Sequence, residues 1–192
     1  MVQRKLFKEY LRKIFHLISV LIIVIYAFLG KQIVLILLFV SLIFFLVLEY
    51  IRLERSIKLP MLHVLYRTSE KNQLGGHVFL TIGAIISIAM FSKQIAFACI
   101  LMTTLGDLFA AIVGKTFGNT KLAYNDKSLE GSASEFVVDL AIGFVFTGNW
   151  IIAVGMAFVA TVVETTVVKI DDNLMIPLIS GITGEILLYL IF

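Results

Sequence analysis

The stretch IVLILLFVSLIFFLVL, residues 33–48, decides the fold class, because Ser41 is its one polar residue. A helix of this composition is apolar on every side, as a helix in contact with lipid must be, and a membrane-crossing helix needs about 20 mostly apolar residues. Strands of a transmembrane barrel would instead alternate polar and apolar residues over segments of about 10 residues. The stretch therefore predicts a transmembrane helix.

The whole chain has the same character. Of its 192 residues, 60% are apolar and 15% are charged, whereas soluble domains average about 45–50% and about 25%. These values exclude an ordinary soluble domain and a disordered chain, and the continuous apolar runs exclude a coiled coil. The single cysteine, Cys99, cannot form a disulfide within the chain. We expect one integral-membrane domain covering residues 1–192.

Seven segments fit membrane-crossing helices, and they cover residues 14–30, 33–51, 77–91, 94–113, 133–148, 150–168 and 174–192. Several are short, which indicates helix ends shielded by protein or a locally thinned bilayer. The first is not expected to be a cleaved signal peptide, since its apolar run is long and no small-residue cleavage site follows. The predicted architecture is an all-α polytopic membrane bundle of about seven transmembrane helices.

Lysine and arginine are distributed unequally between the connections of these helices. Fourteen of the 16 fall on the side of the N-terminus, and the other side holds Lys31 and Lys93. The positive-inside rule therefore predicts a cytoplasmic N-terminus and an external Phe192. The net charge of +3 then reflects topology, and no nucleic-acid partner is expected. We expect a protein of a prokaryotic cell membrane whose active site faces the cytoplasm, where nearly all the acids cluster.

A basic motif, Glu9-x-x-Arg12-Lys13-x-x-His16, lies at the entry to the first helix. Arg12 and His16 are four residues apart and share one helical face. The basic pair alone is explained by anchoring to lipid phosphates. Anchoring does not require a histidine, so a phosphate-binding role is the alternative.

Small residues recur every fourth position in the fourth segment: Gly106, Ala110, Gly114 and Gly118. Such a ridge allows close approach of another helix or of a flat ligand, and helix packing is the simpler interpretation. Asp107 is not explained by packing, because an ionised carboxylate within a span needs a partner or a metal. Lys115 lies two turns further on, at the cytoplasmic end.

The segment Lys127-Ser128-Leu-Glu130-Gly131 precedes the fifth helix. Ser132 and Glu135 fit a capping box, which would begin the helix at Ser132. A helix N-terminus suits phosphate, and Lys127 adds a cation.

Two acids on that helix, Glu135 and Asp139, share one face. A plain capped helix accounts for Glu135 but not for Asp139 or Lys127. The segment therefore favours a phosphate-binding and acid–base site.

The last turn, Asp171-Asp172-Asn173-x-x-x-Pro177, follows Glu164 of the sixth helix. Asn173 fits an N-cap, and Pro177 is tolerated within a first helical turn. Adjacent carboxylates at this level fit a magnesium site, because Mg²⁺ binds one or two carboxylates plus substrate phosphates. A merely solvated turn is the alternative.

Together these motifs resemble the CTP-dependent polyprenol kinase family, which includes dolichol, phytol and CTP-dependent diacylglycerol kinases. The matching motifs run in family order: Arg12-Lys13-x-x-His16, Gly106-Asp107-x-x-Ala110-Ala111-x-x-Gly114-Lys115-x-x-Gly118, Lys127-Ser128-x-Glu130-Gly131 and Asp172-Asn173-x-x-x-Pro177. A more distant likeness to CDP-lipid synthases lacks their C-terminal signature. The chain also lacks the extra N-terminal spans of the dolichol enzymes, which puts dolichol in doubt as the substrate.

The resemblance implies transfer of the γ-phosphoryl group of CTP to a membrane lipid alcohol: a polyprenol, an isoprenoid alcohol of the phytol or geranylgeraniol type, or diacylglycerol. On this hypothesis Asp107 and Asp172 hold Mg²⁺, while Glu130, Glu135 or Asp139 accepts the hydroxyl proton. The phosphates and lipid head are held by a larger set: Arg12, Lys13, His16, Gly106, Gly114, Lys115, Lys127, Ser128, Gly131 and Asn173.

Three other functions are weighed against this one. A cytidylyltransferase would use the same nucleotide and metal to make a CDP-lipid. A cation-coupled carrier would use Asp107, Asp139, Glu164 and Glu185, although the acids concentrate at one face and the two halves show no inverted repeat. A scaffold would leave Asp107 without a purpose. The glycine-rich faces allow a homodimer or a lone bundle.

Overall fold

The computed structural model describes residues 17, 19–55, 73–122, 127–167 and 170–192. The chain divides into two compact units, Met1–Ile82 and Gly83–Phe192. The expectation of one domain stays a prediction.

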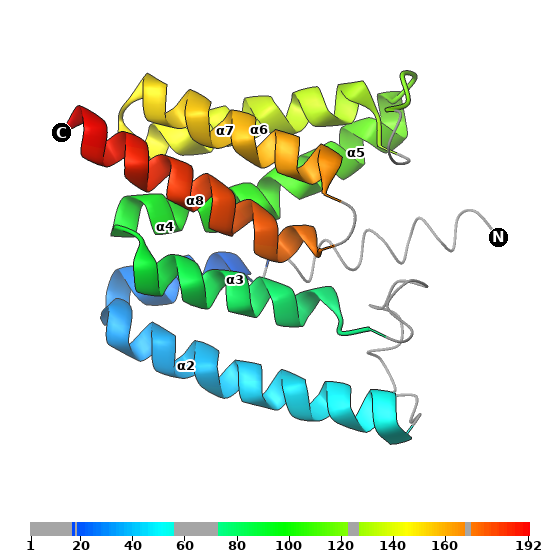
Figure 1. The fold of residues 1–192 in the computed structure, drawn as a ribbon, viewed down its shortest axis with the longest axis vertical. Coiled ribbons are helices and arrows are strands. Elements are labelled where there is room, and N and C mark those ends of the chain that lie inside the picture. Colours follow the sequence, from blue (N-terminus) through cyan, green and yellow to red (C-terminus); the bar gives the residue numbers. More distant parts are fainter. Residues whose placement is uncertain (1–16, 18, 56–72, 123–126, 168–169) are drawn as a thin grey trace. The chain divides into compact units, whose positions relative to one another are not determined.

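The first unit is built on α2, Ser19–Arg55, and contains the start of α3, Gly76–Met90. Inside α2, Gly30 has φ 83° and ψ 173°, a conformation that only glycine adopts without strain. The ribbon turns sharply between the blue and cyan parts of α2 (Figure 1). This break matches the boundary expected between the segments 14–30 and 33–51.

The second unit continues α3 and adds α4 (Lys93–Leu101), a π-helical turn η3 (Met102–Gly106) and α5 (Asp107–Phe117). Three longer helices follow: α6 (Leu129–Thr147), α7 (Trp150–Thr166) and α8 (Asp172–Ile191). Helix α6 packs on α5 and α7, and α7 packs on α8, as Figure 1 shows. These contacts bring together the C-terminal ends of α5 and α7 and the N-terminal ends of α6 and α8.

The core of the second unit is made by the small and flexible side chains of α7 and the apolar side chains of α4. Met156 and Ala157 of α7 and Ile95 of α4 are fully buried. A left-handed Gly148, with φ 65°, ends α6, and the Asn149 side chain accepts hydrogen bonds from the first N–H groups of α7. The short turn makes α6 and α7 antiparallel neighbours.

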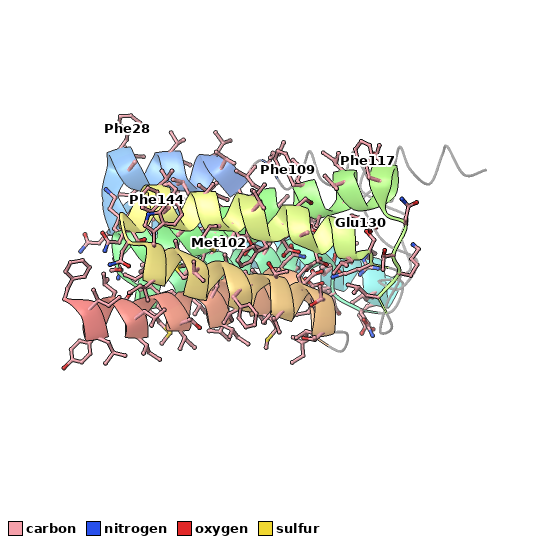
Figure 2. The ribbon with its side chains drawn as sticks, turned by 90° about the horizontal axis from the view of Figure 1, so that it is seen from above. Phe28, Met102, Phe109, Phe117, Glu130 and Phe144 are labelled. Carbon is pink, nitrogen blue, oxygen red and sulfur yellow. The ribbon has the colours of Figure 1, made fainter. Side chains whose placement is uncertain are left out.

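Large apolar side chains cover much of the outer surface. Phe28 of the first unit is 84% exposed and Phe117 of the second is 65% exposed, whereas Met102 is buried; Figure 2 shows these residues. Apolar exposure of this kind marks a surface that meets lipid or another apolar partner.

Among the residues that the structure describes, three helical stretches are long and apolar enough to cross a membrane: Ser19–Glu54, Lys93–Phe117 and Asp172–Ile191. Two shorter apolar helices are Gly76–Met90 and Trp150–Thr166. The predicted all-α class is confirmed for the described residues. The count of seven spans, the cytoplasmic N-terminus and the external Phe192 stay predictions.

Two predicted helix starts are wrong by up to one turn. Helix α6 begins at Leu129, because the Ser128 hydroxyl caps it by accepting from the Gly131 N–H at 3.2 Å. The Ser132 hydroxyl instead donates to the Ser128 carbonyl oxygen. Helix α8 is capped by the side chain of Asp171, which accepts from the Asn173 N–H at 3.1 Å.

Pro177 therefore lies inside α8, beyond the first turn where it was expected. Its ring cannot donate a hydrogen bond to the carbonyl group of Asn173. Gly83 of α3 packs at this gap: a Cβ there would stand 2.7 Å from the Asn173 carbonyl oxygen and 2.9 Å from the Pro177 ring. The proline thus occupies a place where α3 approaches the backbone of α8 closely.

Candidate active site

The small-residue ridge of α5 packs directly against the start of α6. A Cβ on Gly114 would meet the Ser128 Oγ at 3.0 Å, and one on Gly131 would meet the Ala110 carbonyl oxygen at 2.8 Å. Gly118 also packs on the Ser128 side chain. The ridge is therefore used for helix packing, the simpler of the two interpretations. Gly114 and Gly131 were predicted to bind the cofactor. In the structure, their lack of a side chain allows α5 and α6 to approach each other closely.

Short hydrogen bonds fix the loop that leads into α6. The Leu122 N–H donates to the Lys127 carbonyl oxygen, and the Leu129 N–H donates to the Thr120 carbonyl oxygen, both at 2.9 Å. The Glu130 carboxylate accepts from the Thr120 N–H at 3.1 Å. The Glu130 carboxylate thus ties the start of α6 to Thr120, and the backbone bond from Leu122 holds the main chain of Lys127.

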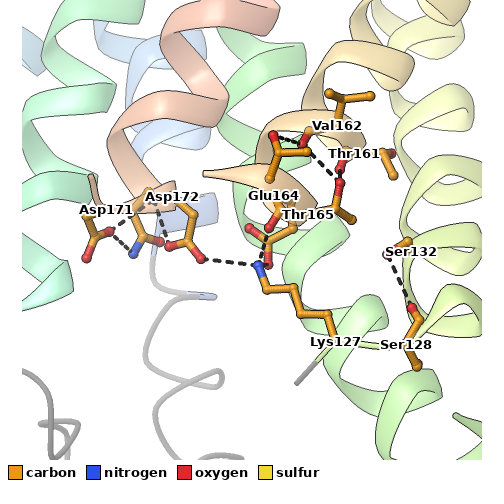
Figure 3. A network of polar contacts seen from close by, with 11 residues as sticks. Lys127, Ser128, Ser132, Thr161, Val162, Glu164, Thr165, Asp171 and Asp172 are labelled. Carbon is orange, nitrogen blue, oxygen red and sulfur yellow. Dashed lines mark hydrogen bonds and ion pairs between the residues drawn. The ribbon is translucent and has the colours of Figure 1, made fainter. Parts of the chain in front are cut away.

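Lys127 reaches from this loop to the ends of two other helices (Figure 3). Its Nζ donates to the Glu164 Oε1 at 2.6 Å and to the Glu164 carbonyl oxygen, and lies 3.9 Å from the Asp172 Oδ2. Burial by itself would lower the pKa of the Lys127 ammonium, but Glu164 and Asp172 outweigh it and raise the pKa above its usual value. Lys127 therefore carries its charge at neutral pH.

Buried acids gather around this pair. Glu164 is 3% exposed, Glu135 is 1% exposed and Asp139 is fully buried. The Glu164 carboxylate interacts electrostatically with Asp172, with Asp107 and, more weakly, with Glu135. Three helices, α5, α7 and α8, thus place acids within electrostatic range of Lys127.

Asp107 begins α5 directly after the π-helical turn η3. It is partly exposed, whereas Asp139 and Glu135 are buried. Asp107 still interacts electrostatically with Asp139, Glu164 and Lys127. Single π turns inside helices are frequently found at functional sites, and this one precedes Asp107.

Asp172 and Asn173 are adjacent in the sequence, but their side chains have different contacts. The Asn173 Nδ2 donates to the Asp171 Oδ1 at 2.7 Å, so its side chain secures the cap of α8. Asp172 turns toward Lys127 (Figure 3). The structure therefore brings Asp172, but not the Asn173 amide, to the acid cluster.

The remaining predicted residues fall into two groups. Lys115 lies exposed in the last turn of α5, and no described contact places it at the Lys127 pair. Arg12, Lys13 and His16 lie outside the described residues, so their predicted roles stay predictions. Glu164 was noted in the sequence but not assigned to the site; its signal is an acid in an otherwise apolar helix, near the helix end.

Glu185, an acid of the proposed carrier, is engaged elsewhere. Its Oε2 accepts from both the backbone N–H and the hydroxyl of Ser92, each at 3.0 Å. Glu185 thus ties α8 to the turn before α4 and has a structural role. This removes a specific reason for the carrier interpretation.

The first unit contains a further buried acid, Glu49, which the sequence did not single out. Arg52 donates to its Oε2 at 2.5 Å, and the His77 Nε2 lies 3.5 Å from its Oε1. Arg52 also donates to the Gln73 carbonyl oxygen at 2.5 Å. These contacts join the end of α2 to the start of α3, which explains His77 as a structural residue.

The acid cluster fits a magnesium ion that is bound together with substrate phosphates. Neither carboxylate oxygen of Asp139, nor the Glu164 Oε2, has a hydrogen-bond partner within the described ranges, so acceptor oxygens remain available there. Those ranges hold no group of three or more His, Cys, Asp or Glu residues arranged for a metal. Mg²⁺ is usually held by one or two carboxylates together with substrate phosphates, and Asp107 and Asp172 supply two. The donor set therefore fits a cation that arrives with a phosphate ligand.

The fold and this site define a helical protein with membrane-length apolar helices and a lysine-centred acid cluster at one end of its second unit. A rice protein named as a probable phytol kinase 1, chloroplastic, is 32% identical over 133 residues, which is 59% of this chain and 42% of the rice protein. The CTP-dependent diacylglycerol kinase 1 of Schizosaccharomyces pombe is 32% identical over 146 residues, 66% of this chain and 65% of the yeast protein.

An uncharacterized protein of Rickettsia prowazekii is 28% identical over 195 residues, 94% of this chain and 95% of that protein. The chain spans less than two thirds of the length of the two named kinases. No family model and no solved structure matches it. The chain is a distant homologue of the phytol kinases and of the CTP-dependent diacylglycerol kinase, and so of the CTP-dependent polyprenol and lipid kinase family.

Proposed function

We propose that this protein transfers the γ-phosphoryl group of CTP to the hydroxyl of a membrane lipid alcohol, at the cytoplasmic side of a prokaryotic membrane. The observation that carries the proposal is the Lys127 ammonium held between Glu164 and Asp172 at the ends of three helices. Its support from relatives is the distant homology to phytol kinases and to a CTP-dependent diacylglycerol kinase.

The reaction requires positioning and charge neutralisation more than covalent chemistry by the protein. Lys127 has three N–H donors, and its two hydrogen bonds to Glu164 leave one donor for a ligand. We assign Lys127 and the start of α6 to the nucleotide phosphates. The ammonium then offsets negative charge on the transferred group without leaving its pair.

Asp107 and Asp172 are assigned to magnesium, with Glu164 as a neighbouring acid within electrostatic range of both. When bound with the nucleotide, the ion supplies charge neutralisation at the phosphates. Glu164 and Asp139 are buried, so this part of the site is held apart from bulk water. A water-poor site disfavours hydrolysis of the nucleotide in place of transfer to the lipid.

The test uses the purified full chain in detergent with magnesium and a panel of lipids. The panel holds a polyprenol, geranylgeraniol, phytol, diacylglycerol and phosphatidic acid. CTP carries its label either on the γ-phosphate or on cytosine, and γ-labelled ATP is run in parallel. We expect the γ-label of CTP, and not the cytosine label, to enter one of the alcohols.

Each of the other possible results would contradict a different part of the proposal. Cytosine label in the lipid fraction would identify a cytidylyltransferase. Equal use of ATP would contradict the assigned donor. Absence of transfer from either nucleotide to any lipid would contradict the kinase proposal as a whole.

A further inference from the structure

Three acids of α6, Glu130, Glu135 and Asp139, are the candidates for accepting the hydroxyl proton of the lipid. The sequence does not rank them, but their surroundings in the structure differ. The ranking below rests on the proposed function, because it concerns the alcohol that this function phosphorylates.

Glu130 is engaged at the start of α6. Its carboxylate accepts from the Thr120 N–H through both oxygens, at 3.1 and 3.3 Å. This contact holds the loop that carries Lys127. Glu130 thus acts on the loop and not on a substrate hydroxyl.

Glu135 and Asp139 are both buried and lie one helical turn apart, about 6 Å along α6. Glu135 interacts electrostatically with Glu164, the partner of Lys127. Glu135 is one turn nearer to the start of α6, the end assigned to the nucleotide phosphates. Asp139 lies one turn further along the helix, away from that end.

The position of the Asp139 carboxylate is set by the α5 backbone. A Cβ on Gly106 would overlap the Asp139 carboxylate, so the side chain occupies the space that glycine leaves open. Gly106 immediately precedes Asp107, and Asp139 interacts electrostatically with Asp107 and Glu164. The Asp139 carboxylate is thus fixed in close contact with the backbone of Gly106.

Both oxygens of Asp139 lack a hydrogen-bond partner in the part of the chain that the structure describes, although the residue is fully buried. A buried carboxylate without a hydrogen-bond partner destabilises the folded protein. Such a group is retained where it serves a ligand that donates a hydrogen bond. An alcohol hydroxyl is a ligand of that kind.

We propose that Asp139 accepts the hydrogen bond, and then the proton, of the lipid hydroxyl. The hydroxyl oxygen forms a bond to the γ-phosphorus of the nucleotide, while the bond from that phosphorus to the β–γ bridging oxygen breaks. The nucleoside diphosphate leaves with the electron pair, and the hydroxyl proton passes to an Asp139 Oδ.

The test compares Asp139→Asn and Glu135→Gln with the wild-type chain in the transfer assay, using the alcohol that the wild type accepts. Glu185→Gln is the matched control, because it also neutralises an acid within a helix but keeps an acceptor oxygen for Ser92. We expect Asp139→Asn to lower kcat by about 10²–10⁴-fold, the usual size of a lost general base, with the KM for CTP within about threefold. Glu185→Gln should stay within about threefold of wild type in kcat.

A second variant separates chemistry from folding. Asp139→Ala leaves space for a small carboxylate, so added formate should restore part of its activity, whereas a structural loss would not respond. Retained activity in Asp139→Asn, no rescue by formate, or a loss confined to Glu135→Gln would each overturn the proposal while leaving the kinase function in place. A wild-type chain without transfer would instead remove the proposed function, and the role of Asp139 with it.

Discussion

Glu49 and Asp139 are equally buried acids with opposite surroundings. Glu49, in the first unit, is 1% exposed and is neutralised by Arg52 at 2.5 Å, with His77 beside it. Asp139, in the second unit, is fully buried, and its oxygens accept no hydrogen bond from the described residues.

The difference separates structure from function. A buried acid with a cation partner joins two helices, and removal of either member costs stability. A buried acid without such a partner costs stability in every folded molecule, so a ligand or a reaction has to explain it. We therefore expect changes in the first unit to affect folding, and changes in the acid cluster of the second unit to affect turnover.

Among substitutions of basic residues, we expect the one at Lys127 to reduce turnover most. Lys127→Ala should reduce transfer by about 10³-fold or more, because charge neutralisation at the phosphates is lost. The variant also leaves Glu164 buried without its ammonium partner, which costs about 3 kcal/mol. Initial rates of γ-label transfer and thermal unfolding in detergent measure the two effects.

The double variant Lys127→Ala with Glu164→Gln distinguishes these effects. It should recover most of the lost stability, since no unpaired charge is left buried, but none of the turnover. Recovery of turnover would show that Lys127 serves only to balance Glu164.

The next effect is on stability and belongs to the first unit. Glu49→Gln should lower the free energy of unfolding by about 3 kcal/mol, because Arg52 is left without its buried counter-charge. The protein that remains folded should transfer phosphate at a rate within about twofold of wild type. A large loss of kcat without a change in unfolding would contradict the division between the two regions.

A smaller effect is expected where α5 meets α6. Gly131→Ala places a methyl group 2.8 Å from the Ala110 carbonyl oxygen and 3.1 Å from the Gly114 Cα. Backbone atoms cannot move aside as a side chain can, so the cost is about 1–3 kcal/mol, reduced by the higher helix propensity of alanine. Unfolding in denaturant would measure it, and a more stable variant would contradict the close packing.

Much of the fold follows from the sequence because apolar runs and glycine breaks are local signals. The expected segments 77–91 and 150–168 correspond to α3 and α7 within two residues at each end, and Gly30 separates the first two segments as expected. The starts of α6 and α8 were misplaced because several residues can cap a helix. Ser128 and Asp171, and not Ser132 and Asn173, are the N-cap residues. Their capping hydrogen bonds depend on the conformation of the preceding loop.

The site was predicted only in part, for the same physical reason. Charge within or beside an apolar stretch is visible in the sequence, and it singled out Asp107, Asp139 and Asp172 as candidates. Pairing between helices is not visible there, so neither the Lys127–Glu164 contact nor the Glu49–Arg52–His77 group was predicted. The sequence of the glycine ridge likewise fits both helix packing and close approach of a ligand. Only the position of α6 in the structure shows that the ridge is used for packing.

The most direct test of the account is the initial rate of γ-phosphoryl transfer from CTP by the Asp107→Asn variant, measured beside its thermal unfolding. Asp107 stands next to Gly106 in the acid cluster, and its partial exposure allows replacement by a neutral side chain of the same shape. The account predicts a loss of transfer of at least about 10²-fold, with a midpoint of unfolding within about 3 °C of wild type. Full transfer activity in a folded Asp107→Asn protein would contradict it.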